Sequence, residues 1–212
     1  MKFTKIIAAA ALAVLSLPAQ AEYLGVMNGR SANLDLAPNL SVEGAFVTGD
    51  YGAIEADYQN IGARVNFKAS PLLVVFGDFG LAELGDFDGN AFGLGAFYMV
   101  EGLFTSVDFA AKVSYHLSSQ ERTGFQDVDF TVLAVEGLFS GKSGLGANGD
   151  IGWYFNAGIH RLSAEAGNND DSETELGFGG GFIVPMASGE LYGGVDLVDE
   201  MTFGVGYRHF IN

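Results

Sequence analysis

The residues best suited to catalysis are two histidines, His116 and His160, and the serine that follows the second of them. A histidine can act as the general base for a serine nucleophile, and the stretch His160-Arg161-Leu162-Ser163 holds both types within four positions. If this stretch is a strand, side chains three residues apart point to opposite faces, so His160 and Ser163 do not meet. The sequence therefore predicts no catalytic set and no enzyme.

Metal binding is the second chemistry to consider. The chain has no cysteine, which excludes thiolate zinc sites and disulfides. The two histidines fall on predicted strands that are two apart, about 10 Å from each other, too far to share one metal ion. One segment, 163–175, is rich in carboxylates: Glu165, Asp170, Asp171, Glu173 and Glu175. It lacks the ligand spacing of a dedicated calcium loop, so we expect a solvated acidic external loop and no metal or cofactor.

Charge and composition narrow the class of protein. Among 212 residues, 26 are acidic and 10 are basic, giving a formal net charge of −16. Phosphate binding needs a basic patch, so nucleic acid is not an expected partner. Only 17% of residues are charged and 49% are hydrophobic, which excludes an acidic disordered tail. The length suits one domain.

The first 21 residues have the pattern of a secretory signal peptide. Lys2 and Lys5 precede an apolar run at 6–17, and Ala19-Gln20-Ala21 provides the small residues that signal peptidase requires. The run is too short for a membrane helix, which needs about 20 apolar residues. We predict a signal peptide at 1–21, a segment of uncertain structure at 22–39 and one domain at 40–212.

The rest of the chain alternates at period two, as half-buried strands do. In 107–117, for example, Val107, Phe109 and Ala111 fall on one face, and Asp108 and Lys112 on the other. The same reading predicts ten strands, near 40–48, 58–68, 72–82, 90–99, 104–117, 127–138, 150–162, 174–184, 190–198 and 201–211. Outside the signal peptide, no helical periodicity stands out.

The predicted connections are of two alternating kinds. One kind is polar and often longer, at 49–57, 83–89, 118–126 and 163–173. The other kind is mostly tight, at 69–71, 100–102 and 185–189, with a long exception at 140–150. Such alternation is typical of a strand meander that crosses a membrane, with long external loops and short periplasmic turns.

A pentapeptide also recurs in the chain. The sequence Val-Glu-Gly-Leu-Phe occupies 100–104 and again 135–139. A duplicated β-hairpin would explain the recurrence, and chance similarity in a chain rich in Gly and Phe is the alternative.

The two faces of the strands distinguish a membrane barrel from a soluble sandwich. One face is uniformly apolar and aromatic, whereas the other mixes Gly, Asn, Ser, Lys, Arg and Asp, as expected for lipid outside and a polar lumen inside. We therefore predict an all-β fold, a transmembrane antiparallel up-and-down β-barrel of ten strands. Eight strands, and a secreted or periplasmic sandwich, are the alternatives.

The closing strand Thr202-Phe203-Gly204-Val205-Gly206-Tyr207-Arg208, with the signal peptide and the meander, resembles the small outer-membrane β-barrel proteins of Gram-negative bacteria, the OmpA/OmpX-like group. The pattern covers the whole chain after the signal peptide, and the sharp motif only the last strand. Members typically end on an aromatic residue that the barrel-assembly machinery reads; here His209 stands at the alternating position. The resemblance implies an outer-membrane location, with membrane lipid and that machinery as partners.

Inside such a barrel we expect a polar network of both charge signs: Glu43, Arg64, Lys68, Asp78, Asp108, Lys112, His116, Asp129, His160, Asp196 and Arg208. Buried charges must pair, so these side chains are expected to fill the lumen as ion pairs. The expected role is structural or a surface interaction through the external loops, with an unidentified extracellular ligand. The alternative is a narrow, weakly cation-selective, porin-like channel for small solutes.

The signal-peptide prediction has a direct test. N-terminal sequencing of the exported protein should begin at Glu22. A first residue before Ala21 would contradict the predicted cleavage site.

Overall fold

The computed structural model describes residues 26–51, 56–121, 127–143, 151–167, 169–198 and 200–211. The predicted signal peptide lies outside these residues. The elements are a short 3-10 helix η1 (Leu34–Leu36) and the strands β1 (Leu40–Tyr51), β2 (Ala56–Ser70), β3 (Leu73–Leu84), β4 (Phe87–Met99), β5 (Asp108–Glu121), β6 (Val128–Ser143), β7 (Ile151–Ala166), β8 (Asn169–Met186), β9 (Gly189–Val198) and β10 (Glu200–Ile211). Within the described ranges, no helix is long and apolar enough to cross a membrane.

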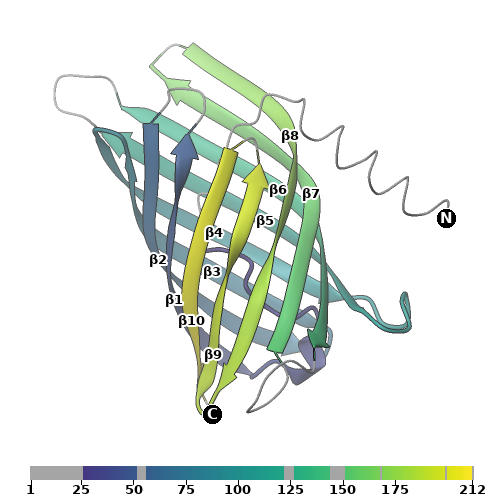
Figure 1. Cartoon of the computed structure of the whole chain (residues 1–212). Helices are drawn as coiled ribbons and strands as arrows, with labels where there is room; N and C mark the ends of the chain where they lie inside the picture. The colour runs from purple at the N-terminus through teal and green to yellow at the C-terminus, as the bar shows by residue number, and fades with distance from the viewer. Residues whose placement is uncertain are drawn as a thin grey trace.

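The strands form one closed antiparallel barrel (Figure 1). Each strand pairs with its neighbours in the chain, and β1 pairs with β10 from Leu40↔Ile211 to Gly49↔Thr202. The predicted up-and-down barrel of ten strands is confirmed, and the alternative of eight strands is wrong.

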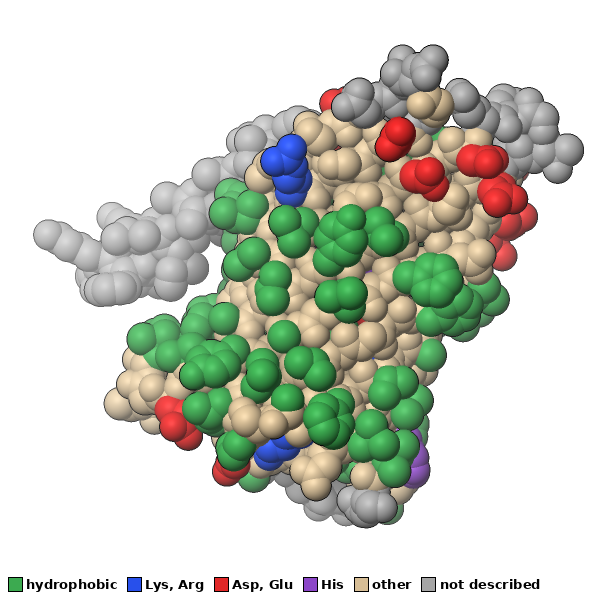
Figure 2. Space-filling model, turned by 180° about the vertical axis from the view of Figure 1, so that it is seen from behind, with side chains coloured by type: hydrophobic (Ala, Val, Ile, Leu, Met, Phe, Trp, Pro, Cys, Tyr) green, Lys and Arg blue, Asp and Glu red, His purple; other side chains and the backbone are tan. Residues whose placement is uncertain are grey.

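Period-two alternation sets the two faces of the wall. Along β3 and β5 every second residue is buried in the lumen and the intervening ones are exposed. Between the two ends of the barrel the exposed set is apolar, including Leu94 and Phe182 at 64% exposure each, and Figure 2 shows green side chains spread over the face in view. We call this outward apolar set the apolar belt. Charged side chains lie inside instead, the reverse of a soluble barrel and the arrangement that lipid requires.

The two ends of the barrel differ. We call the end where β1 begins and β10 finishes the terminal end, and the opposite end the acidic end. The fully described connections are residues 85–86 at the acidic end and residues 71–72, 100–107 and 187–188 at the terminal end. The predicted loops at 49–57 and 118–126 fall partly outside the described residues, whereas the predicted polar loops at 83–89 and 163–173 are mostly strand, so those two predictions are wrong. The polar segments there continue the strands, because side chains beyond the apolar belt can be polar while the backbone ladder goes on.

The two copies of the recurring pentapeptide have different structures. Residues 100–104 follow the end of β4, whereas residues 135–139 lie within β6. The copies meet in space, since the ring centroids of Phe104 and Phe139 are 5.8 Å apart. They are not equivalent parts of two duplicated hairpins.

The lipid-facing belt predicts the effect of a charge at its middle. Leu94 points outward from the centre of β4, and Ser119 points outward from β5 near the acidic end. Leu94→Arg should lower the free energy of unfolding by about 2–4 kcal/mol, and Ser119→Arg by about 1 kcal/mol or less, because the cost of a cation falls from the bilayer centre to its edge. Urea unfolding in lipid vesicles measures both. Equal effects of the two substitutions would contradict a lipid-facing belt.

Candidate functional site

The lumen holds the segment that the sequence left unassigned. Residues 26–39 run inside the barrel to the terminal end before β1 begins (Figure 1, dark purple). We call this segment the N-terminal plug. Its apolar side chains pack against the wall, since Val26, Met27, Ala32 and Leu34 are at most 1% exposed. The plug thus contributes apolar surface to a lumen whose wall is largely polar.

Side chains of the plug also bond to the wall. The Asn28 amide donates to Glu136 Oε1 at 2.9 Å, and Arg30 Nη1 donates to Asn66 Oδ1 at 3.0 Å. The Arg30 guanidinium also lies 4.5 Å from the ring centroid of Phe97. These contacts reach β6, β2 and β4, so the plug touches well-separated parts of the wall.

Ser140 of β6 anchors the plug near the terminal end. Its hydroxyl oxygen accepts from the Ala32 backbone N–H at 2.8 Å and lies 3.1 Å from the Ser31 hydroxyl oxygen. From the wall, Arg64 donates to the carbonyl of Val26 at 2.8 Å. Backbone and side chains of the plug therefore both contribute to its fixed position.

The first ion-pair cluster of the wall joins Arg64, Asp78 and His116. Arg64 Nε and Nη2 each donate to one carboxylate oxygen of Asp78 at 2.6 Å, a bidentate pair. His116 Nε2 lies 2.9 Å from Asp78 Oδ2. All three residues are at most 8% exposed. The carboxylate that would orient the histidine in a catalytic pair is thus already engaged by an arginine.

Glu136 of β6 is the junction between wall and plug. Lys112 Nζ lies 2.5 Å from Glu136 Oε2, and Oε1 accepts from both Asn28 and Asn156, the latter at 3.0 Å. His160 Nε2 lies 3.9 Å from the same Oε1. One carboxylate therefore links β5, β7 and the plug.

The third cluster lies toward the terminal end around Glu43. Arg208 Nε donates to Glu43 Oε1 at 2.8 Å, and Arg208 Nη1 donates to Glu190 at 2.7 Å. The Tyr192 hydroxyl donates to Glu43 Oε2 at 2.9 Å. Arg208 also donates to the plug carbonyl of Gly29 at 3.0 Å. This cluster joins the strands that close the barrel, β1 and β10, to the plug.

Asp196 of β9 has no cationic partner among the described residues. Its Oδ1 accepts from the Asn156 amide at 3.1 Å, and its Oδ2 makes no hydrogen bond. The two side chains meet across Gly179 of β8, where a Cβ atom would collide with both. Glycine at this position therefore makes room for an inward polar contact between β7 and β9.

The structure places most of the predicted lumen residues inside the barrel. Buried there are Glu43, Arg64, Asp78, Lys112, His116, His160, Asp196 and Arg208. Lys68 and Asp108 lie at the terminal mouth, where Lys68 Nζ donates to the Asp35 carbonyl at 2.7 Å and Asp108 accepts from Asn33 at 3.3 Å. Placing Asp129 in the lumen is wrong, since it is exposed on the outer face of β6.

The error at Asp129 and the omission of Glu136 have one cause. The inward residues of β6 include Val132, Ala134 and Leu138, and the outward ones include Leu133 and Val135. Because both faces are mostly apolar, hydrophobicity alone does not tell which face is inside. The single charge in mid-strand, Glu136, was the signal that could have fixed the register. The plug residues Asn28 and Arg30 carried no such strand signal.

The predicted acidic loop is part of a strand hairpin. Its acidic residues belong to β7 and β8: Glu165, Asp170, Asp171, Glu173 and Glu175. The last outward apolar pair is Ile159↔Leu176, so the hairpin beyond it, residues 160–175, rises past the apolar belt. There, desolvation and the nearby Glu175 and Asp171 carboxylates raise the pKa of Glu173. Red side chains gather at this end in Figure 2.

Outward carboxylates continue around the acidic end. Beyond the apolar belt, β1 to β7 each carry one on their outer face: Asp50, Asp57, Glu83, Asp88, Glu121, Asp129 and Glu165. We call this ring the acidic collar. Several members stand directly opposite one another, as in Glu83↔Asp88 and Asp88↔Glu121, a like-charge pairing that destabilises a sheet. The collar is therefore not explained by stability of the barrel.

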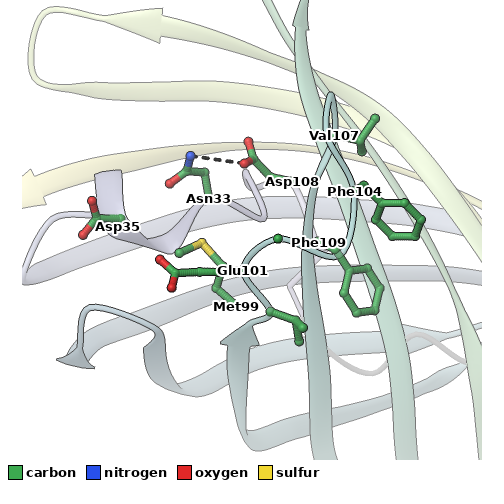
Figure 3. A pocket seen from close by; sticks show the side chains of 10 residues that line it. Asn33, Asp35, Met99, Glu101, Phe104, Val107, Asp108 and Phe109 are labelled. Atoms are coloured by element: carbon green, nitrogen blue, oxygen red, sulfur yellow. Dashed lines mark hydrogen bonds between the residues drawn. The ribbon is translucent and has the colours of Figure 1, made fainter.

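A hollow of about 230 Å³ lies at the terminal mouth (Figure 3). The plug contributes Asn33 and Asp35, the wall contributes Met99 and Asp108, and the β4–β5 connection contributes Glu101. Across the described ranges, no group of three His, Asp or Glu side chains could hold a metal ion.

Comparison with known proteins gives evidence on the class of protein to which this fold belongs. No protein family and no curated protein matches the chain. Among solved structures, the translocator domain of the autotransporter NalP from Neisseria meningitidis is similar at a TM-score of 0.51 and 12% identity, covering 84% of this chain and 91% of that one. A KdgM porin is similar at a TM-score of 0.37 and 10% identity, covering 81% of this chain and 99% of that one. The chain has the fold of an outer-membrane β-barrel. The comparisons do not assign it to the OmpA/OmpX-like group.

The ion-pair clusters predict unequal effects for two carboxylates. Asp78→Ala leaves the buried Arg64 without its partner and should lower the free energy of unfolding by about 3–5 kcal/mol. Asp129→Ala, on the exposed outer face, should change it by about 0.5 kcal/mol or less. Urea titration of both variants in vesicles measures the difference. A large loss at Asp129 would contradict its placement outside the lumen.

Proposed function

We propose that this protein is a closed outer-membrane barrel of a Gram-negative bacterium that works as a structural or surface-interaction component without catalysis. The observation that carries the proposal is the N-terminal plug, which fills the lumen and bonds to three ion-pair clusters of the wall. We expect a lumen filled in this way to hold no continuous water path, which leaves the outer surface of the barrel for function.

The proposed lack of catalysis is supported by how the histidines are bonded. His116 shares Asp78 with Arg64, and His160 lies beside a Glu136 that Lys112 already pairs. Both histidines are at most 4% exposed inside the lumen. A substrate at the membrane surface would not reach them.

The proposed partners follow from the outer surface. The apolar belt fits membrane lipid, and an outer-membrane barrel requires the barrel-assembly machinery for insertion. Kinship with the OmpA/OmpX-like group rests on the closing strand and the alternation of the sequence. The extracellular ligand is addressed below through the acidic end.

A channel is the second candidate, favoured by the charge of the wall without the plug. The strand residues on the lumen-facing side below the acidic end then comprise six carboxylates, Glu43, Asp78, Asp108, Glu136, Glu190 and Asp196, and five cations, Arg64, Lys68, Lys112, Lys142 and Arg208. This excess of negative charge would favour cations weakly. Such a channel would conduct only after the plug has left.

Single-channel recording in planar bilayers tests the proposal. The chain beginning at Glu22 should insert without conductance steps, because the plug closes the lumen. Asn28→Ala combined with Arg30→Ala removes two of its contacts to the wall and should produce brief, weakly cation-selective openings.

A disulfide supplies the matched control. The chain has no cysteine, and the hydroxyl oxygens of Ser31 and Ser140 are 3.1 Å apart, so Ser31→Cys with Ser140→Cys places two sulfurs within bonding reach. Added to the double alanine variant, the disulfide should abolish the openings, and reduction should restore them. Steady conductance of the unaltered chain would overturn the closed barrel and favour the channel.

A further inference from the structure

The β7–β8 hairpin leaves one strand edge without a partner. β8 begins at Asn169 and pairs with β7 along its whole upper part, from Ala166↔Asn169 downward. On its other side the ladder to β9 starts only at Gly177↔Val198. Residues 169–176 of β8 therefore have no neighbour on that side among the described strands. In Figure 1 the pale-green hairpin continues beyond the ends of the yellow strands β9 and β10.

This free edge is long and lies outside the apolar belt. Eight residues of strand extend about 26 Å. Half of the backbone N–H and C=O groups in such a stretch point toward the missing neighbour, which is the template that an added strand uses. The outer-face residues Ser172 and Thr174 are polar and exposed, so lipid does not cover this edge.

The inner face of the same stretch carries a regular row of carboxylates. Asp171, Glu173 and Glu175 alternate along β8 and so share one face, about 7 Å from one to the next. None of the three forms an ion pair with a described residue. An added strand would place its own side chains directly opposite this row.

We propose that the free edge of β8 at residues 169–176 binds an extended segment of a partner protein that carries Lys or Arg at every second residue. The segment adds as a strand to β8, and its cations face Asp171, Glu173 and Glu175. This inference rests on the proposed surface-interaction role and gives that role a site and a partner chemistry.

The negative charge of the free edge disfavours a second copy of this chain as the added strand. A second copy of this chain would bring its own carboxylates opposite Asp171, Glu173 and Glu175, and like charges across a ladder repel. Acidic side chains on a free edge thereby protect it from self-association. They leave it open to a strand of opposite charge.

A peptide-binding experiment tests the proposal. The probe is a labelled eight-residue peptide with lysine at alternate positions and threonine or valine between them. The protein is the chain from Glu22, folded in phosphatidylcholine vesicles so that the lipid carries no net charge. Fluorescence anisotropy should show saturable binding, and hydrogen exchange should show new protection of backbone amides in 169–176.

Two controls separate strand addition from general attraction. Glu173→Lys with Glu175→Lys should weaken binding at least about tenfold. Glu83→Lys with Asp88→Lys makes the same charge change on the β3–β4 hairpin, whose strands are paired on both sides, and should weaken it far less. A peptide N-methylated at alternate residues should lose binding because it lacks the donors.

The outcomes are distinct from those of the conductance test. Equal weakening by both charge variants, equal binding of the N-methylated peptide, or no protection in 169–176 would each overturn the added strand. A conducting lumen would overturn the closed barrel and leave the binding result untouched.

Discussion

The structure depends on one constraint, that backbone N–H and C=O groups in lipid have no water to pair with. A sheet in a bilayer must therefore close, and the β1–β10 ladder from Leu40↔Ile211 to Gly49↔Thr202 does this. Once the sheet is closed, the polarity of the side chains on each face can match the environment that the face meets. The apolar belt and the polar lumen both follow from a backbone that is paired on both sides throughout the height of the belt.

The filled lumen follows from the cost of burying charge. Arg64, Lys112 and Arg208 each form an ion pair with a carboxylate of the wall. Each of these three clusters also makes a hydrogen bond to the N-terminal plug: Arg64 to the Val26 carbonyl, Glu136 to Asn28, and Arg208 to the Gly29 carbonyl. The wall pairs these cations with its own carboxylates, and the plug supplies the further hydrogen-bond partners. The plug adds both polar partners and apolar volume, which explains why a segment without strand periodicity is nevertheless buried.

The two ends of the barrel show what happens where this constraint is relaxed. Past the belt, water screens charges and solvates backbone groups. The acidic collar can therefore place Asp88 opposite Glu83 and Glu121, and β8 can extend past β9 with one side unpaired. Neither feature is required for closure, so the acidic end is where the chain departs from what a stable barrel alone would need.

The sequence by itself predicted the class and ten strands, with eight as the alternative, because period-two alternation marks each strand and in most of them separates an apolar face from a polar one. It also placed Arg64, Asp78 and Lys112 inside, since each lies on the face of its strand opposite to the uniformly apolar one. Only the tertiary structure decided the rest. The identical pentapeptides at 100–104 and 135–139 lie in a connection and in a strand. The register of β6 places Asp129 on the outer face and Glu136 on the inner face. The segment 26–39 lies inside the barrel and at its terminal mouth. For β6 the mid-strand charge of Glu136 was a local signal, whereas the other outcomes depend on contacts with residues distant in the chain.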